Sequence, residues 1–266
     1  MKSFRLLSVC VVLVAVMGLV QGCSRGPSEE ELKLAAFQEQ FAALEVGYNA
    51  LVETRVEIEV AEAALVELQA IPENKLTDEQ KLELEEIQTG IEASVVESEA
   101  GFEEVQGLLA DFLNIGINDF PESQETAAAL LIYADEAILV ADDMVAKSGD
   151  YKKAMDHLST AEGYFSAAGL TPYHPMVAKI AEFDDWRFIT QERFDEVKKG
   201  MTKEEVVAVV GQVYFRNIQE SPEKGVESWL YKKREGGAAA FYFKTKNGKI
   251  YDKNWEAVAV TTVVEE

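Results

Sequence analysis

Residues 191–211 have the sequence QERFDEVKKGMTKEEVVAVVG. Gly200 follows two lysines, a pattern typical of a helix end, because glycine adopts the left-handed conformation there and cations favour the last turn. Thr202 and Glu205 form a capping-box pattern, which predicts the start of a second helix. Gly211 predicts its end. This stretch therefore predicts two short helices joined by a tight turn.

The chain after this stretch contains β-prone segments and two hairpin signals, Gly236-Gly237 and Asn247-Gly248. We expect the order α-α-β-β-β, with both helices on one face of a small antiparallel sheet. The strand-like segments are Val213–Ile218, Glu227–Lys233, Ala238–Lys244 and Lys249–Val258. The expected core anchors are Trp229, Tyr231, Phe241, Phe243 and Trp255.

Residues 29–113 predict a long antiparallel hairpin of two helices. Ser28 and Thr77 are candidate N-caps, and Pro72 lies in the break between the helices. Each helix would be about 55–60 Å long at 1.5 Å per residue. The helical spacing comes from Leu34, Phe37, Phe41, Leu44, Tyr48 and Leu51, and then from Leu84, Ile87, Ile91, Val95, Phe102, Val105, Leu109 and Phe112. Polar or small residues interrupt this seam and argue against a strict coiled coil: Arg55, Ser94, Ser98 and Gly101.

Residues 124–188 predict a helical bundle that follows a loop at 114–123. Helices are expected at 124–147, 151–168 and 176–188, and Thr190 is expected to cap a short helix that ends at Lys199. The segment from Gly149 to Ala161 resembles the second helix of a tetratricopeptide repeat, although Asp142 lies where that repeat has a small residue. A single unit does not make a repeat array. The fold class is therefore α+β, with a helical hairpin and bundle before the C-terminal domain.

The formal net charge of −23 is unevenly distributed. Residues 29–125 contain 25 acidic and 4 basic residues, whereas residues 190–264 contain 11 acidic and 13 basic ones. The acidic part argues against nucleic acid as a partner and against lying flat on an anionic lipid surface, because both would repel it. The simplest interpretation is a solvated acidic stalk that bears a mildly basic head.

The N-terminus resembles a bacterial lipoprotein signal peptide. Lys2 and Arg5 precede an apolar run at 6–20, and Leu19-Val20-Gln21-Gly22-Cys23 follows the lipoprotein pattern. The resemblance implies removal of residues 1–22 by cleavage between Gly22 and Cys23, lipidation of Cys23 and a tether at 23–28. The alternative is an ordinary secretory signal with a chance cysteine. Cys10 would leave with the signal, so no disulfide is expected.

The C-terminal region, residues 190–264, resembles the SmpA/OmlA (BamE-like) lipoprotein domain. The resemblance rests on Phe194, Val197, Lys198, Lys199, Gly200, Met201, Thr202, Val206, Gly211, Trp229 and Tyr231. It implies structural roles for Gly200, Met201, Thr202, Val206 and Gly211. It also implies an outer-membrane lipoprotein that supports the β-barrel assembly machinery and contacts anionic lipid. Ser24, which is not aspartate, favours the outer membrane, facing the periplasm. Two features depart from the family: Gln212-Val213 stand where it often has proline, and residues 24–188 have no counterpart.

No constellation of residues indicates an enzyme, a cofactor, a metal or a small-molecule substrate. Neighbouring Asp156, His157 and Ser159 cannot converge on one helix, so we expect His157 at the surface. His174 lacks a second ligand at metal spacing. Basic residues lie at the hairpin ends of the predicted sheet, either as a solvated edge or as a contact for anionic lipid or an acidic protein. They are Lys232, Lys233, Arg234, Lys244, Lys246, Lys249 and Lys253.

Two functions remain open. The first is an accessory lipoprotein in outer-membrane β-barrel assembly or envelope integrity, whose head binds an envelope protein. The second is a non-enzymatic scaffold or spacer lipoprotein that binds an unrelated envelope protein, because a fold does not fix a function.

Overall fold

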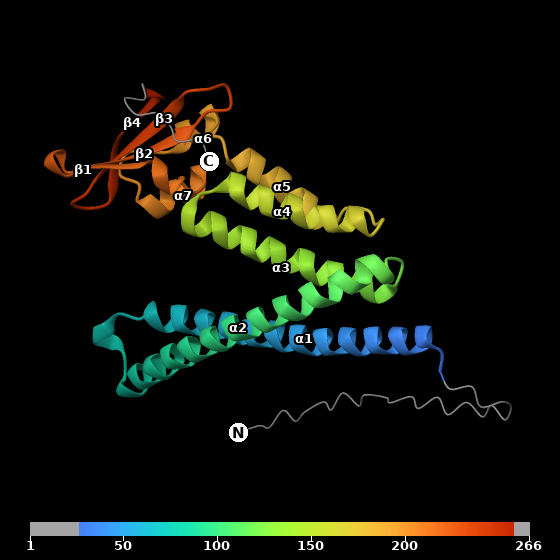
Figure 1. The fold of residues 1–266 in the computed structure, drawn as a ribbon. Helices are drawn as coiled ribbons and strands as arrows, with labels where there is room; N and C mark the ends of the chain where they lie inside the picture. Colours follow the sequence, from blue (N-terminus) through green and yellow to red (C-terminus); the bar gives the residue numbers. More distant parts are fainter. Residues whose placement is uncertain (1–26, 258–266) are drawn as a thin grey trace.

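The computed structural model describes residues 27–257. A long helical hairpin, a three-helix bundle and a C-terminal head with a four-stranded antiparallel sheet follow one another along the chain (Figure 1). The α+β fold class is confirmed. The signal peptide at 1–22, Gly22, Cys23 and most of the tether lie outside the described residues, as do residues 258–264 of the predicted C-terminal domain.

The hairpin consists of α1 (Glu29–Gln69) and α2 (Asp78–Asp119), with a short 3-10 helix, η1 (Glu73–Lys75), between them. Both predicted N-caps are present, and each is part of a capping box, Ser28 with Glu31 and Thr77 with Gln80. These boxes start the helices because each side chain satisfies a backbone N–H that lacks a partner in the first turn.

The predicted loop at 114–123 is wrong over its first half, because α2 continues to Asp119. Gly116 lies against α3, where an added Cβ would be 2.6 Å from Oγ1 of Thr126. The Asn118 side chain donates a hydrogen bond to the backbone oxygen of Asn114, one turn earlier. Close packing therefore outweighs the low helix propensity of glycine and asparagine, and only residues 120–123 form the connection.

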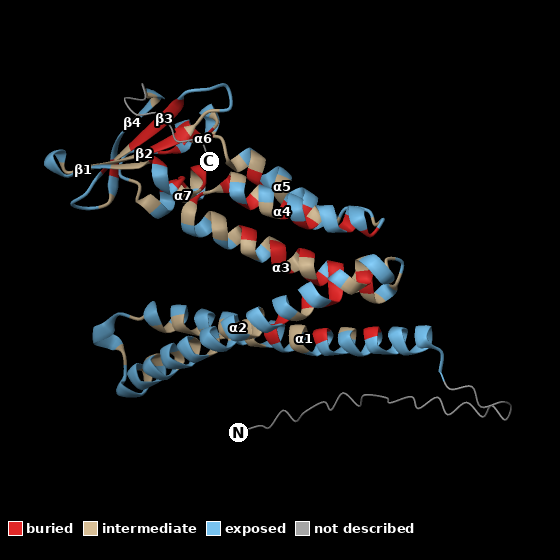
Figure 2. Cartoon of the chain, in the orientation of Figure 1, coloured by how far each residue is buried: buried red, intermediate tan, exposed pale blue. Residues whose placement is uncertain are grey.

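The two helices of the hairpin are unevenly buried. The seam is buried near Phe37, Leu44 and Leu51 of α1 and at the matching C-terminal part of α2, but no residue from 52 to 104 is buried (Figure 2). The antiparallel register follows from Gly101, whose position faces Leu51. Residues 52–104, which we call the arm, are thus held mainly by each other.

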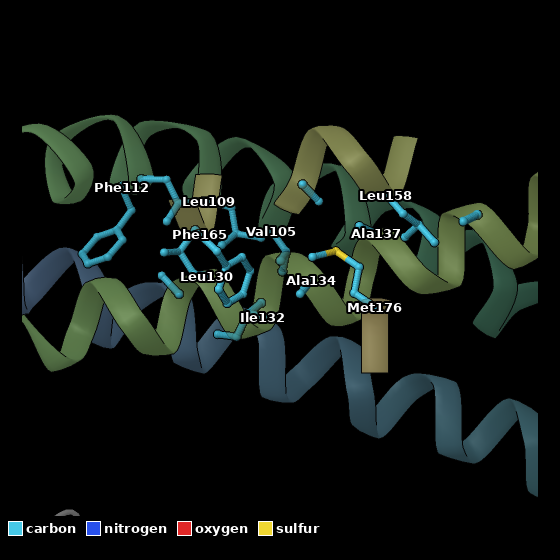
Figure 3. Close-up of a cluster of buried hydrophobic side chains, with 14 of the residues drawn as sticks. Val105, Leu109, Phe112, Leu130, Ile132, Ala134, Ala137, Leu158, Phe165 and Met176 are labelled. Atoms are coloured by element: carbon cyan, nitrogen blue, oxygen red, sulfur yellow. The ribbon is translucent and has the colours of Figure 1, made fainter. Parts of the chain in front are cut away.

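The bundle consists of α3 (Gln124–Ser148), α4 (Tyr151–Ala167) and α5 (His174–Trp186), close to the predicted bounds. Buried alanines let α3 and α4 approach closely, and larger side chains from α2, α4 and α5 fill the space around them (Figure 3). Asp142, which departs from the tetratricopeptide pattern, forms an ion pair with Lys179 of α5 at 3.2 Å. Its position faces a third helix, so a small residue is not needed there.

The head contains α6 (Gln191–Glu196) and α7 (Lys203–Val210), then β1 (Ile218–Ser221), β2 (Val226–Lys232), β3 (Ala238–Lys244) and β4 (Lys249–Ala257). The strands pair in the order β1-β2-β3-β4, all antiparallel. The sheet therefore has one strand more than the predicted α-α-β-β-β order. The predicted strand Val213–Ile218 is wrong, because Phe215–Asn217 form a 3-10 helix, η2, and pairing begins at Ile218.

The core of the head lies between the two short helices and one face of the sheet. Trp229, Tyr231, Phe241 and Phe243 are buried there as predicted, with Val206 and Val210 of α7 in the same cluster. Trp255 is only half-buried. Its ring meets the edge of Phe194, with centroids 5.2 Å apart, and the Lys233 ammonium lies 4.9 Å from its centroid. Trp255 therefore lies at the border of the core of the head and not inside it.

Candidate functional site

The Gly200-Met201-Thr202 turn connects α6 to α7 and binds the sheet. Gly200 donates a backbone hydrogen bond to the oxygen of Ile250 at 2.8 Å, and Ile250 donates one back to the oxygen of Met201 at 2.9 Å. Thr202 caps α7 in the predicted box with Glu205. The prediction that Gly200 caps the preceding helix is wrong, since α6 ends at Glu196. Gly200, with a φ of 95°, instead shapes a turn that attaches to β4.

Gly211 lies at the joint between the head and the bundle. An added Cβ there would be 2.7 Å from the Tyr151 hydroxyl oxygen and 3.0 Å from the Trp186 ring. The Tyr231 hydroxyl donates to the oxygen of Gly211 at 3.0 Å, and burial raises the pKa of Tyr231, which keeps this donor protonated. The glycine therefore allows three aromatic side chains to meet around one backbone position.

Sequence reasoning missed the residues that attach the head to the bundle. The backbone N–H of Gln212 donates to the Tyr151 hydroxyl oxygen at 2.9 Å. Proline at this position would have no N–H and could not make this bond. The partners are 61 residues apart in the chain, and no local pattern at either residue indicates this bond.

Ion pairs surround the same joint. Arg234, in the β2–β3 turn, contacts Asp184 of α5 at 2.9 Å. Arg193 of α6 forms an ion pair with Asp185, and its guanidinium lies 4.0 Å from the centroid of the Trp186 ring. Stacking of arginine on indole adds an attraction beyond the charge pair. The bundle and the head are therefore joined by packing, hydrogen bonds and charge together.

The predicted basic residues do not form one patch. Lys232, Lys233 and Arg234 lie at the β2–β3 end of the sheet, where Lys232 pairs with Ala238 in the register. The other set, Lys244, Lys246 and Lys249, lies at the β3–β4 end, about 20 Å away over six strand residues.

The two basic ends differ in how far their charges are engaged within the chain. At the β2–β3 end, Lys233 contacts Glu256 at 3.0 Å and Arg234 contacts Asp184 at 2.9 Å. Lys253 belongs to neither end, because it pairs with Phe241 within the sheet, and its ammonium donates to the Phe194 oxygen at 2.7 Å. Burial lowers the pKa of Lys253. By contrast, Lys244, Lys246 and Lys249 are all exposed. Contact with anionic lipid or an acidic protein stays a prediction, and the β3–β4 end is the better candidate.

A cavity of about 540 Å³ lies between the C-terminal part of α2, the middle of α3 and α4. His157 is part of its wall. The Nε2 atom of His157 is buried and has no hydrogen-bond partner in the described part of the chain. The expectation that this histidine lies on the helix surface is met only in part, because the side chain is half-buried beside a cavity lined by α2, α3 and α4.

The buried position of His157 predicts a pH effect on stability. Burial lowers the pKa of His157 below its ordinary value of 6.5. The folded state then binds fewer protons than the unfolded state, so stability is lost as the pH falls through about 6.5. We expect the melting temperature of the wild-type protein to fall more between pH 7.5 and pH 5 than that of His157→Gln. The effect should be modest because the ring is partly exposed, and parallel pH profiles would contradict it.

Within residues 27–257, no group of three or more His, Cys, Asp or Glu side chains is placed to hold a metal ion. The described helices include none that combines the length and apolar character needed to cross a membrane. His174 is the first residue of α5. No protein-family model matches the chain, and neither the curated proteins nor the solved structures contain a significant match.

Proposed function

We propose that this chain is an outer-membrane lipoprotein whose C-terminal head binds a protein of the β-barrel assembly machinery as an accessory. The observation that carries the proposal is the Gly200-Met201-Thr202 turn, which joins two short helices on one face of an antiparallel sheet. The BamE-like resemblance rests on these residues, and Gly200 and Met201 contact Ile250 of β4. The lipoprotein pattern at Gly22 and Cys23 supports the location.

The head offers a protein-binding surface and no catalytic centre in this proposal. Its exposed basic end at Lys244, Lys246 and Lys249 would contact an acidic partner or anionic lipid headgroups. The acidic hairpin would be repelled by an anionic membrane surface, which leaves the head as the part suited to that contact. Lipid attached to Cys23 would hold the chain at the membrane, with no cofactor required.

Affinity purification tests this function. The full chain, tagged at its C-terminus, is recovered from gently crosslinked membranes, and the proteins that accompany it are identified. We expect components of the β-barrel assembly machinery, and at least a fivefold lower recovery with the double variant Lys246→Glu and Lys249→Glu. The matched control is Lys33→Glu with Lys81→Glu, which reverses two exposed charges on the hairpin and should leave recovery unchanged. A different envelope protein in place of these components would contradict the proposal.

The arm favours a second candidate function, a scaffold lipoprotein in which the hairpin sets a distance. No residue from 52 to 104 is buried, so the chain maintains a long projection with few contacts to the bundle. Deletion of residues 56–69 together with 83–96 removes two heptads from each helix and shortens the arm by about 21 Å. Loss of function in this variant, with recovery of the partner by the head intact, would favour the spacing role. Full function would reject it.

A further inference from the structure

The cavity between α2, α3 and α4 is independent of the head and of the function proposed for it. Its lining residues belong to 106–118 of α2, 133–140 of α3 and 157–167 of α4. Its volume of about 540 Å³ falls within the range of small-molecule sites, about 300–1,000 Å³. Most of its wall is apolar or aromatic, including Leu109, Ala110, Leu113, Tyr133, Ala137 and Tyr164.

One residue of this wall, His157, has a buried polar atom without a partner in the described part of the chain. Nε2 of His157 is buried and forms no hydrogen bond within the described residues, although nearly all buried polar atoms of folded proteins form one. The side chain is only half-buried, so a rotation of the imidazole would let a molecule in the cavity form the missing hydrogen bond. Tyr133 and Tyr164 stand edge-to-face, with ring centroids 5.3 Å apart, and form an aromatic part of the same wall.

The charges around the cavity restrict what it can hold. Glu136 is the buried carboxylate in the wall, and Arg55 already neutralises it through two hydrogen bonds of 2.5 and 2.9 Å. A cation is therefore not needed there. An anion would meet the acidic surface of α2, which lacks basic residues beyond Lys81. Desolvation also keeps the imidazole neutral near pH 7.

We propose that this cavity binds a small, uncharged and mainly apolar molecule that has one hydrogen-bonding group directed at His157. The apolar wall supplies the binding energy through burial of apolar area, and the imidazole fixes the orientation of the ligand. The site does not depend on the head, so its ligand is distinct from the protein partner proposed above.

Fluorescence titration with N-phenyl-1-naphthylamine tests the site, because this probe is neutral and apolar and has a single N–H group. The full chain with Cys23→Ser keeps lipid and detergent out of the assay. We expect saturable binding of one equivalent, with a dissociation constant in the micromolar range. His157→Phe keeps a ring and removes both nitrogens, and should weaken binding about three- to tenfold, the value of one hydrogen bond.

Two tryptophan variants on α2 separate the cavity from the general apolar surface. Ala110→Trp places an indole at the cavity wall and should weaken binding at least tenfold, whereas Ala100→Trp, exposed and outside the cavity, should change nothing. The anionic probe 1-anilinonaphthalene-8-sulfonate should bind at least tenfold more weakly than the neutral one. Absence of saturable binding, or binding that Ala110→Trp leaves intact, would overturn the site. Circular dichroism checks that each variant is folded. Photolabelling tests the site without any variant: a neutral aryl diazirine should mark residues 106–118 and 157–167 of the wild-type chain.

Discussion

Replacement of Arg55 by methionine should destabilise the protein by about 3 kcal/mol, because it leaves the Glu136 carboxylate buried without a partner. The Glu136 side chain is 3% exposed, and Arg55 contacts it with both terminal nitrogens, at 2.5 and 2.9 Å. The same guanidinium lies 5.7 Å from the centroid of the Phe102 ring. Arg55 thus connects α1, α2 and α3 at the point where the arm begins. Urea unfolding would measure the loss, and the melting temperature should fall by roughly 6–12 °C.

Two variants distinguish the buried charge from the loss of an ordinary surface pair. Arg55→Met combined with Glu136→Leu removes both charges and should recover most of the stability, since paired replacement of a buried ion pair is often neutral or stabilising. Lys33→Met removes a pair with Glu29 whose side chains are 66% and 85% exposed, and should cost less than about 0.5 kcal/mol. A single Arg55→Met variant as stable as Lys33→Met would show that Glu136 is solvated.

The arginine also shows what the sequence could and could not predict. Periodicity and capping predicted the long helices, because these signals are local: Ser28 with Glu31 and Thr77 with Gln80 form their bonds within one turn. Arg55 was recognised only as an interruption of the seam. Its partner lies 81 residues away on α3, and nothing in the sequence near either residue indicates the pairing.

The errors in the head have the same origin. Gly200 stands after two lysines as a helix cap would, yet the helix ends earlier because the turn bonds to Ile250, fifty residues further along the chain. The hairpin signals Gly236-Gly237 and Asn247-Gly248 were reliable, because a turn conformation is decided by the residues within it. The sequence also indicated the basic residues of the candidate site. It did not indicate that they lie at two separate ends of the sheet, because the register of β2 and β3 decides their positions. The cavity at His157 is lined by α2, α3 and α4 together, and no local pattern records how these helices are arranged.

Gly149 is the position in the joint where a single methyl group should have the largest effect. Its φ is 66°, and its N–H donates to the Val145 oxygen at 2.8 Å, as in a left-handed C-cap. An added Cβ would lie 2.2 Å from the oxygen and 2.4 Å from the carbonyl carbon of Val213. Both atoms belong to the backbone, so no side-chain rotation relieves the contact. The segment that begins the sheet domain after α7 would have to move away from α3.

We therefore expect Gly149→Ala to destabilise the protein by about 3 kcal/mol or more, of which about 1–2 kcal/mol is the left-handed conformation of alanine and the rest the contact with Val213. Gly169→Ala is the matched control: its φ is 68°, and an added Cβ meets nothing within 4 Å. Urea unfolding gives both costs, and hydrogen exchange of the peptide that contains Gln212 should accelerate only in Gly149→Ala. Equal losses of stability in the two variants would mean that the backbone at Val213 moves away from residue 149 at little cost in free energy. A larger loss at Gly149 would mean that bundle and head unfold together, so a partner bound by the head would be held at a fixed position relative to the arm.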